Sequence, residues 1–182
     1  MKTVLYLFLI FIFFNSVCTQ LTYEHEAEID FATYQTAYIM TIDNAEDWFW
    51  DDDHAYLVEY LAKKIERKSD FTAIYDAYRH SSSWSETVDC IIDVRLKSMR
   101  KEEEIHEEDR TIEIKCDLEL IVWDRADSTV ILRATEDDEE SESISNYLST
   151  DQMNDRIYDL RIEAMKNCLD EIASHFLKDL EI

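Results

Sequence analysis

The clearest pattern in the chain is an alternation of apolar and polar side chains over residues 111–123, which read TIEIKCDLELIVW. Apolar residues occupy every second position, from Ile112 to Val122, and charged residues fill most positions between them. This period of two is typical of a β-strand with one buried face and one face in water. We therefore expect residues 111–123 to be the central strand of a sheet.

Four other stretches have strand-like composition or alternation, namely residues 31–42, 71–78, 87–97 and 129–135. They are rich in β-branched and aromatic residues, which favour strands. The last two flank the central strand, so the three together predict an antiparallel meander. The charged residues 99–110 between them predict a long exposed hairpin end, and the acidic residues 136–145 predict a solvated loop.

Two stretches have helical spacing instead. Residues 54–68 carry Leu57, Val58, Leu61 and Ile65 on one face and basic residues near the C-terminal end, which suits the helix dipole. A longer helix is expected near the C-terminus, capped by Thr150, Asp151 or Asn154. Its predicted buried stripe is Ile157, Leu160, Ala164, Cys168, Ile172 and Phe176.

These elements together predict an α+β fold. Two helices with single apolar stripes and a sheet with one apolar face form a two-layer sandwich. We expect a mostly antiparallel sheet of about five strands, with both helices on one face and water on much of the other.

The N-terminus is patterned as a secretory signal. Lys2 is followed by an apolar run of about a dozen residues, too short for a comfortable membrane span. We expect residues 1–19 to be a signal peptide and residues 20–182 to be a single secreted α/β domain. A second interpretation makes Cys18 the lipidated first residue of a lipoprotein, which alone would attach the chain to a membrane.

Charge limits the partners. The chain has 42 Asp and Glu against 18 Lys and Arg, a formal net charge of -24. Nucleic acid is excluded because phosphate binding needs a basic patch. Basic proteins and divalent cations remain compatible, and so does a role of the charge in solubility alone.

Glycine and proline are both absent from the 182 residues. This excludes the glycine-dependent phosphate loops, dinucleotide turns, nucleophile elbows and EF-hands. Turns are therefore expected to use Asn, Asp and Ser.

Candidate binding residues form two groups. Three consecutive aromatics, Trp48, Phe49 and Trp50, cannot all be buried by one helix, and Ile91, Ile121 and Trp123 fall on the outward strand face. These side chains predict a partner-binding surface or a sheet face covered by the N-terminal segment.

The other group has metal-like ligands. Asp51, Asp52, Asp53 and His54 would suit a hard cation such as calcium, although capping of the following helix explains the same acids without a metal. The acids of residues 137–142 have the same ambiguity. No cofactor is expected.

Three cysteines remain after signal removal. Cys90 and Cys116 fall on the inward faces of neighbouring strands, and Cys168 falls on the terminal helix stripe. A Cys90–Cys116 bridge is one alternative, and free buried thiols are the other, favoured one.

A resemblance appears at residues 30–36, which read DFATYQT. A signal, a short lead-in and a D-F-x-x-Y-x-T first strand resemble small periplasmic or outer-membrane lipoprotein families of Gram-negative bacteria, many of which are domains of unknown function. The resemblance implies a small α/β sandwich in the cell envelope, similar in layout to the lipoprotein plug of the lipopolysaccharide translocon and to curli-secretion lipoproteins. It does not imply an enzyme.

The leading functional hypothesis is a non-enzymatic secreted or cell-envelope domain that binds or assembles another envelope protein. A divalent-cation or small-ligand binding module is the alternative, and an enzyme comes third. The expected location is secreted or periplasmic, with outer-membrane association if Cys18 is lipidated.

Overall fold

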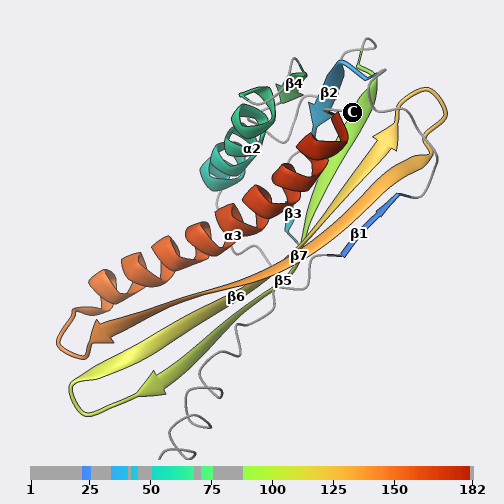
Figure 1. Ribbon diagram of the computed structural model, residues 1–182. Helices are drawn as coiled ribbons and strands as arrows, with labels where there is room; N and C mark the ends of the chain where they lie inside the picture. The colour runs from blue at the N-terminus through green and yellow to red at the C-terminus, as the bar shows by residue number, and fades with distance from the viewer. Residues whose placement is uncertain are drawn as a thin grey trace, which may run out of the picture.

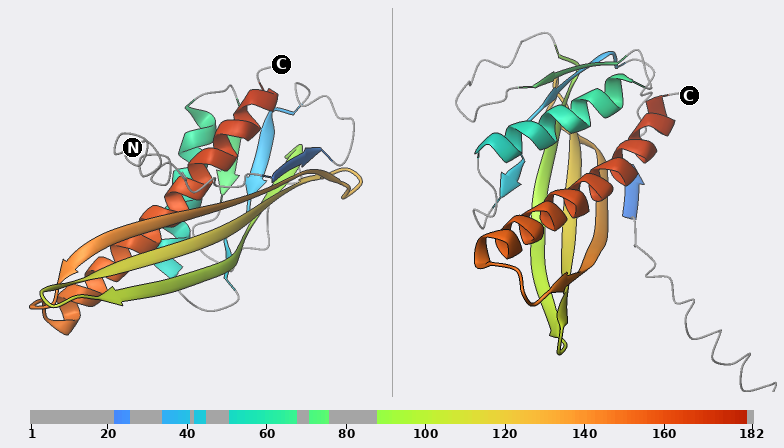
Figure 2. Two further views of the ribbon diagram at one scale, coloured as in Figure 1. Left: turned by 60° about the horizontal axis from the view of Figure 1, so that its bottom comes forward. Right: turned by 90° about the vertical axis from the view of Figure 1, so that its left-hand side faces the viewer.

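A computed structural model describes residues 22–25, 34–40, 42–44, 51–67, 71–75 and 88–180. These residues form one sheet and two helices that lie on the same side of it (Figures 1 and 2). The elements in chain order are β1 Thr22–His25, β2 Thr36–Ile39, β3 Asp43–Asn44, α2 Asp51–Glu66, β4 Thr72–Tyr75, β5 Cys90–Ile105, β6 Asp109–Asp124, β7 Val130–Ser145 and α3 Thr150–Leu180. The predicted α+β class is confirmed. The predicted signal lies outside the described residues.

The sheet order is β1-β7-β6-β5-β2-β4, with β3 beside β5. The meander β5-β6-β7 is antiparallel as predicted. The short strand β2 runs parallel to both β4 and β5. All five predicted strands are present, and β1 and β3 add two short ones.

Both helices pack their apolar stripes on the inner face of the sheet. The stripe predicted for α3 is confirmed, with Ala164, Cys168, Ile172 and Phe176 fully buried. Phe176 packs edge-on against Phe71, with ring centroids 6.0 Å apart. Ser149 rather than Thr150 caps α3, since its Oγ accepts a hydrogen bond from Gln152 N at 3.3 Å.

The three meander strands are longer than their apolar patterns. Each has 16 residues, which corresponds to roughly 53 Å. The 31-residue helix α3 has a length of roughly 46 Å. The strands and α3 therefore extend together beyond α2, to the narrow end seen in Figure 1.

The prediction of a loop at residues 136–145 is wrong, because these residues are the second half of β7. Alternate acids face α3, where Asn167 Nδ2 donates to Glu140 Oε1 at 2.6 Å and Arg156 lies 4.0 Å from Glu142. Pairing with β6 satisfies the backbone N–H and C=O groups of every second residue along the segment. The acidic composition of residues 136–145 therefore does not distinguish this strand from a loop.

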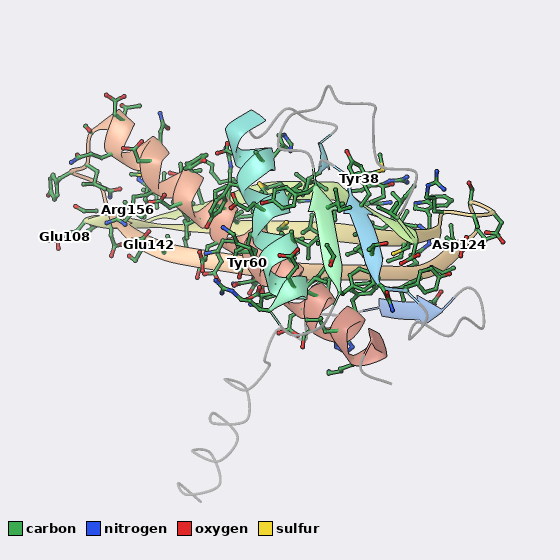
Figure 3. The ribbon with its side chains drawn as sticks, turned by 90° about the horizontal axis from the view of Figure 1, so that it is seen from above. Tyr38, Tyr60, Glu108, Asp124, Glu142 and Arg156 are labelled. Carbon is green, nitrogen blue, oxygen red and sulfur yellow. The ribbon has the colours of Figure 1, made fainter. Side chains whose placement is uncertain are left out.

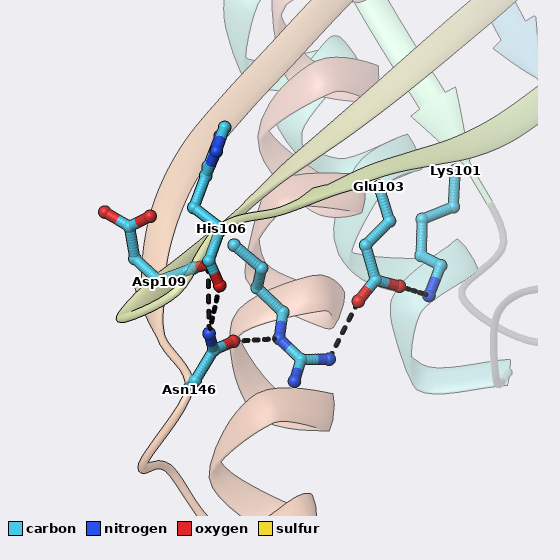
Figure 4. A network of polar contacts seen from close by, with 6 residues as sticks. Lys101, Glu103, His106, Asp109 and Asn146 are labelled. Carbon is cyan, nitrogen blue, oxygen red and sulfur yellow. Dashed lines mark hydrogen bonds and ion pairs between the residues drawn. The ribbon is translucent and has the colours of Figure 1, made fainter.

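A polar network fixes the narrow end, where β5 turns into β6 (Figure 4). Asn146 Nδ2 donates to the carbonyl oxygens of His106 and Asp109 at 2.9 and 3.0 Å. Arg110 Nε donates to Asn146 Oδ1 at 2.9 Å, and Arg110 Nη1 donates to Glu103 Oε1 at 2.7 Å. The hairpin predicted at residues 99–110 is thus mostly strand, with a turn of only His106 to Glu108.

Candidate functional site

An apolar row crosses the outer face of the sheet, opposite the helices. The register places Tyr38 beside Ile74 and Ile91, Ile91 beside Trp123, and Trp123 beside Val130. Each residue comes from a different strand, and none is fully buried. We call Ile74, Tyr38, Ile91, Trp123 and Val130 the outer apolar row. It lies at the broad end of the molecule, where Figure 3 labels Tyr38.

A hollow of about 320 Å³ opens beside this row. Its walls are Met40, Ile91, Asp93, Trp123, Asp124 and Ser128. Met40 is 42% exposed and is held at the end of β2 by its N–H, which donates to Ile92 O at 2.8 Å. An exposed methionine beside a half-buried tryptophan provides an adaptable apolar contact.

Two carboxylates form the rim of the hollow. Arg95 holds Asp93, with Nε and Nη2 at 2.9 and 2.6 Å from Oδ2. Asp124 Oδ2 accepts a hydrogen bond from the Tyr34 hydroxyl at 2.5 Å, and this hydrogen bond lowers the pKa of Asp124. Arg95 therefore neutralises Asp93, and the carboxylate of Asp124 supplies the negative charge at the rim that would favour a basic group beside an apolar one.

Ile121 has a different place from the one predicted. It lies on the outer face, but only 1% of it is exposed, between Asp93 and Arg133 in the register. Its neighbour Glu119 is also buried and is held by Arg133 at 2.7 Å and Lys97 at 3.5 Å. Ile121 is therefore too buried to contact a partner directly, which corrects its predicted role as a partner-binding residue. Trp123 does reach the hollow.

The aromatic residues Trp48, Phe49 and Trp50 lie outside the described residues, so their contribution stays a prediction. The structure adds Met40, Tyr38 and Ile74, which sequence patterning did not single out. Their common signal is an apolar side chain at an outward strand position, and this signal needs the register to be seen.

The predicted cation segment is only partly described. Asp53 and His54 are buried at the start of α2, and Asp53 accepts a hydrogen bond from the Tyr158 hydroxyl. The side chains of Asp51 and Asp52 are outside the described part. Within the described ranges, no group of three His, Cys, Asp or Glu side chains is arranged to hold a metal ion. The acids of residues 137–142 are included in that statement.

A larger hollow of about 620 Å³ lies beside Asp53, between the two helices and β5. It is lined by Asp53, Lys101, Asn154, Asp155, Ile157, Tyr158 and Arg161. Its volume falls in the range of small-molecule sites. The two cationic side chains in its wall make it a poor site for a metal ion.

The described cysteines are buried and free. Burial raises the pKa of Cys90 to about 12. A hydrogen bond with the Cys116 thiol, together with burial, raises the pKa of Cys168. Cys90 is opposite Asp124 and Cys116 is opposite Met99, so the two lie roughly 25 Å apart along the sheet. The Cys90–Cys116 bridge is therefore excluded.

No protein-family model matches the chain, and neither does any curated protein. Solved structures do resemble it. A PelC dodecamer structure from Paraburkholderia phytofirmans has 7% identity and a TM-score of 0.49, over 86% of this chain and 95% of that chain. A hypothetical protein from Chlamydia trachomatis has 13% identity and a TM-score of 0.48, over 81% and 98%.

A minor lipoprotein from Acinetobacter baumannii is also similar, with 12% identity and a TM-score of 0.42, over 81% of this chain and 90% of that chain. The chain is thus similar to bacterial lipoproteins and to proteins without an assigned function. The D-F-x-x-Y-x-T motif stays a prediction. Neither described helix is long and apolar enough to cross a bilayer.

Proposed function

We propose that this chain is a non-enzymatic secreted or cell-envelope domain that binds another envelope protein through the outer apolar row. The row itself carries this proposal. The outer face of a two-layer sheet is ordinarily polar, whereas five neighbouring strands here present apolar side chains at one level. A contiguous apolar patch on a soluble domain marks a contact surface.

The rim adds selectivity. Asp124 flanks the hollow beside Trp123 and has no cationic partner among the described residues, so a partner with an apolar side chain next to a lysine or arginine would complement it. A chain of net charge -24 would also attract such a partner over some distance at low salt.

Enzymatic chemistry has less support. The thiols of Cys90 and Cys168 have raised pKa values and are buried, so neither supplies a thiolate nucleophile. His106 lies at the narrow end, 4.0 Å from the exposed acid Glu104. Neither arrangement pairs a nucleophile with a base in a cleft.

The test is partner capture from the envelope fraction, followed by binding of the purified partner. Ile74→Asp and Trp123→Ala should each weaken binding at least tenfold, because each removes part of the row. Ile105→Asp is the matched control, since Ile105 is 67% exposed at the other end of the molecule. Equal loss in Ile105→Asp and Ile74→Asp, or no loss in either row variant, would contradict the proposal.

Binding of a small ligand in the 620 Å³ hollow is the second candidate function, with Lys101 and Arg161 in its wall to contact an anionic group of the ligand and Asp53 and Asp155 to contact a polar one. Inorganic phosphate should then raise the melting temperature saturably, beyond the effect of sodium chloride at equal ionic strength. Lys101→Gln should abolish the difference. Equal stabilisation by both salts would exclude this candidate.

A further inference from the structure

The second half of β7 has a strand partner on only one side within the described part of the chain. β6 pairs with it from Glu136 to Ser145. β1 reaches only Leu132 to Thr135 on the other side (Figure 1). Among the described residues, residues 136–145 therefore form an open sheet edge, which we call the β7 edge.

One hydrogen bond fixes which backbone groups point outward along the β7 edge. Asn146 N donates to Glu108 O at 3.1 Å, while Asp109 and Ser145 face each other in the register. Asp109 and Ser145 therefore form a pair without mutual hydrogen bonds, and the pattern alternates from there. Even-numbered residues of β7 bond to β6, and the odd-numbered residues from Asp137 to Ser145 direct N–H and C=O outward.

The pairing with β1 follows the same parity. Thr135 and Arg133 face Thr22 and Glu24 of β1. A strand added beside residues 137–145 would continue the position of β1 along β7.

The β7 edge is acidic on both faces. Asp138 and Glu139 have no ion pair among the described residues, and Glu140 accepts only the Asn167 amide, at 2.6 Å. Lys115, opposite Glu139 in the register, is already bound by Glu102 at 3.3 Å and Glu113 at 2.6 Å. Among the described residues, no cation therefore neutralises Asp138, Glu139 or Glu140, whereas Glu142 lies 4.0 Å from Arg156.

α3 adds to this field. Its Glu171 is exposed and lies one turn beyond Asn167, on the same helix face. An added strand would pass with one face along α3 and the other in water. Acidic groups would border the inner face of such a strand, and Asp137 and Glu139 would border its outer face.

We propose that the β7 edge accepts an extended lysine- or arginine-rich segment of a partner protein as an additional strand. Outward N–H and C=O groups supply main-chain hydrogen bonds, as in other cases of strand addition. The carboxylates select the charge of the added strand. They also oppose pairing with the β7 edge of a second copy, because like charges would then face each other across the strands.

This inference goes beyond the proposed function, because the β7 edge and the outer apolar row are separate surfaces. The row lies at the broad end, and Glu142 at the edge lies near the narrow end, as labelled in Figure 3. Trp123→Ala should leave binding at the β7 edge unchanged. The two proposals can therefore fail separately.

The test uses a ten-residue peptide in which lysine alternates with threonine and valine, titrated into the mature chain by calorimetry. Ser141→Pro removes one outward N–H without removing a bond to β6, and it should weaken binding at least tenfold. Ser141→Ala keeps the N–H and should bind as the unchanged chain does. Binding should also slow hydrogen exchange at the amides of Glu139, Ser141 and Ser143.

Two control peptides separate hydrogen bonding from charge. A peptide of the same sequence, N-methylated at alternate residues, keeps its charge but loses backbone donors, and it should bind at least tenfold more weakly to the unchanged chain. A peptide with glutamate in place of lysine should not bind. The proposal is overturned if the lysine peptide does not bind, if Ser141→Pro and Ser141→Ala bind it equally, or if N-methylation has no effect.

Discussion

Ser128 adopts a backbone conformation that glycine usually supplies. Its φ is 60°, in the left-handed region, at the turn between β6 and β7. Asp124 and Asp127 support this turn, since their carboxylates accept the N–H groups of Ala126 at 2.7 Å and Thr129 at 3.0 Å. The expectation that Asp and Ser would form turns without glycine is confirmed here.

Ser128→Gly should therefore stabilise the fold. It relieves a left-handed cost of roughly 1–2 kcal/mol and adds about 0.5–1 kcal/mol of backbone entropy to the unfolded chain. The expected net gain is about 0.5–1 kcal/mol in the free energy of unfolding, measured with urea. Ser141→Gly, in the extended strand β7, is the control and should destabilise the chain. A loss of stability in Ser128→Gly would contradict the strain argument.

Two aspartates near the outer apolar row, Asp89 and Asp124, make the free energy of unfolding depend on pH in the acidic range. Burial raises the pKa of Asp89, but hydrogen bonds from Gln35 N and Thr36 N, both at 2.8 Å, outweigh burial and lower it. The Tyr34 hydroxyl lowers the pKa of Asp124. A lowered folded pKa contributes stability above the unfolded pKa of about 4, and this stability is lost as the pH falls through the folded value.

The urea midpoint should thus fall as the pH decreases from about 5 to 2. Asp89→Asn should be less stable than the unchanged chain at pH 6, because the amide offers a neutral acceptor to the same donors. The difference should shrink at pH 2. A difference that is constant with pH would mean that Asp89 contributes by shape alone.

At the scale of elements, α2 and α3 are joined by a tyrosine that donates to a carboxylate. Tyr60 Oη donates to Asp170 Oδ1 at 2.6 Å, and Lys64 lies 2.6 Å from the other oxygen of Asp170. Burial, followed by this hydrogen bond, raises the pKa of Tyr60 to about 12. Since the unfolded pKa is near 10, this contribution is complete below pH 10 and is lost between about pH 10 and 12.

Tyr60→Phe should cost about 1 kcal/mol in the free energy of unfolding at pH 7, because one hydrogen bond is lost while Lys64 still pairs with Asp170. Tyr56→Phe is the matched control on the same helix, since Tyr56 is 47% exposed. It should change stability by less than about 0.5 kcal/mol. Equal effects of the two variants would refute a specific helix contact.

The elements with strong periodicity could be predicted from the sequence. The apolar stripe of α3 and the alternation of β6 each identify one buried face, so both appear where expected. The second half of β7 could not be predicted, because its acids are compatible with a loop until α3 and β6 supply partners. Strand β1 has only four residues, and its position depends on a register more than a hundred residues away.

The candidate site could be predicted only in part. Ile91 and Trp123 share a parity that marks the outward face, and both reach the hollow. Ile121 shares this parity too, yet the ion pairs around Glu119 and Asp93 surround it. Tyr38 and Ile74 required the parallel pairing of β2, which no local pattern encodes.

For the whole molecule, the thiols of Cys116 and Cys168 offer a link between the sheet and α3. Cys168 Sγ donates to the Cys116 carbonyl oxygen at 3.8 Å, so the two cysteines are neighbours across the core. Diamide should oxidise this pair slowly, because the raised pKa of Cys168 keeps the thiolate scarce, and it takes up the two thiol hydrogens as the S–S bond forms. Mass spectrometry should find the chain two hydrogens lighter, with Cys90 still reduced.

Cys90→Ser should leave this oxidation unchanged, and Cys116→Ser should abolish it. The disulfide should also stabilise the chain by about 2–4 kcal/mol, because it closes a loop of about fifty residues in the unfolded state. A bridge that includes Cys90 would contradict the register of β5 and β6.

The register of β1 against β7 has a consequence for the order in which the chain folds. Thr22 faces Thr135, 113 residues later (135 − 22), and β2 must wait for β5. Such distant pairings slow folding. In a chain exported N-terminus first, β1 and β2 would emerge long before their partners. If the chain is secreted as proposed, a factor that receives it would have to shield β1 and β2 until β7 has crossed.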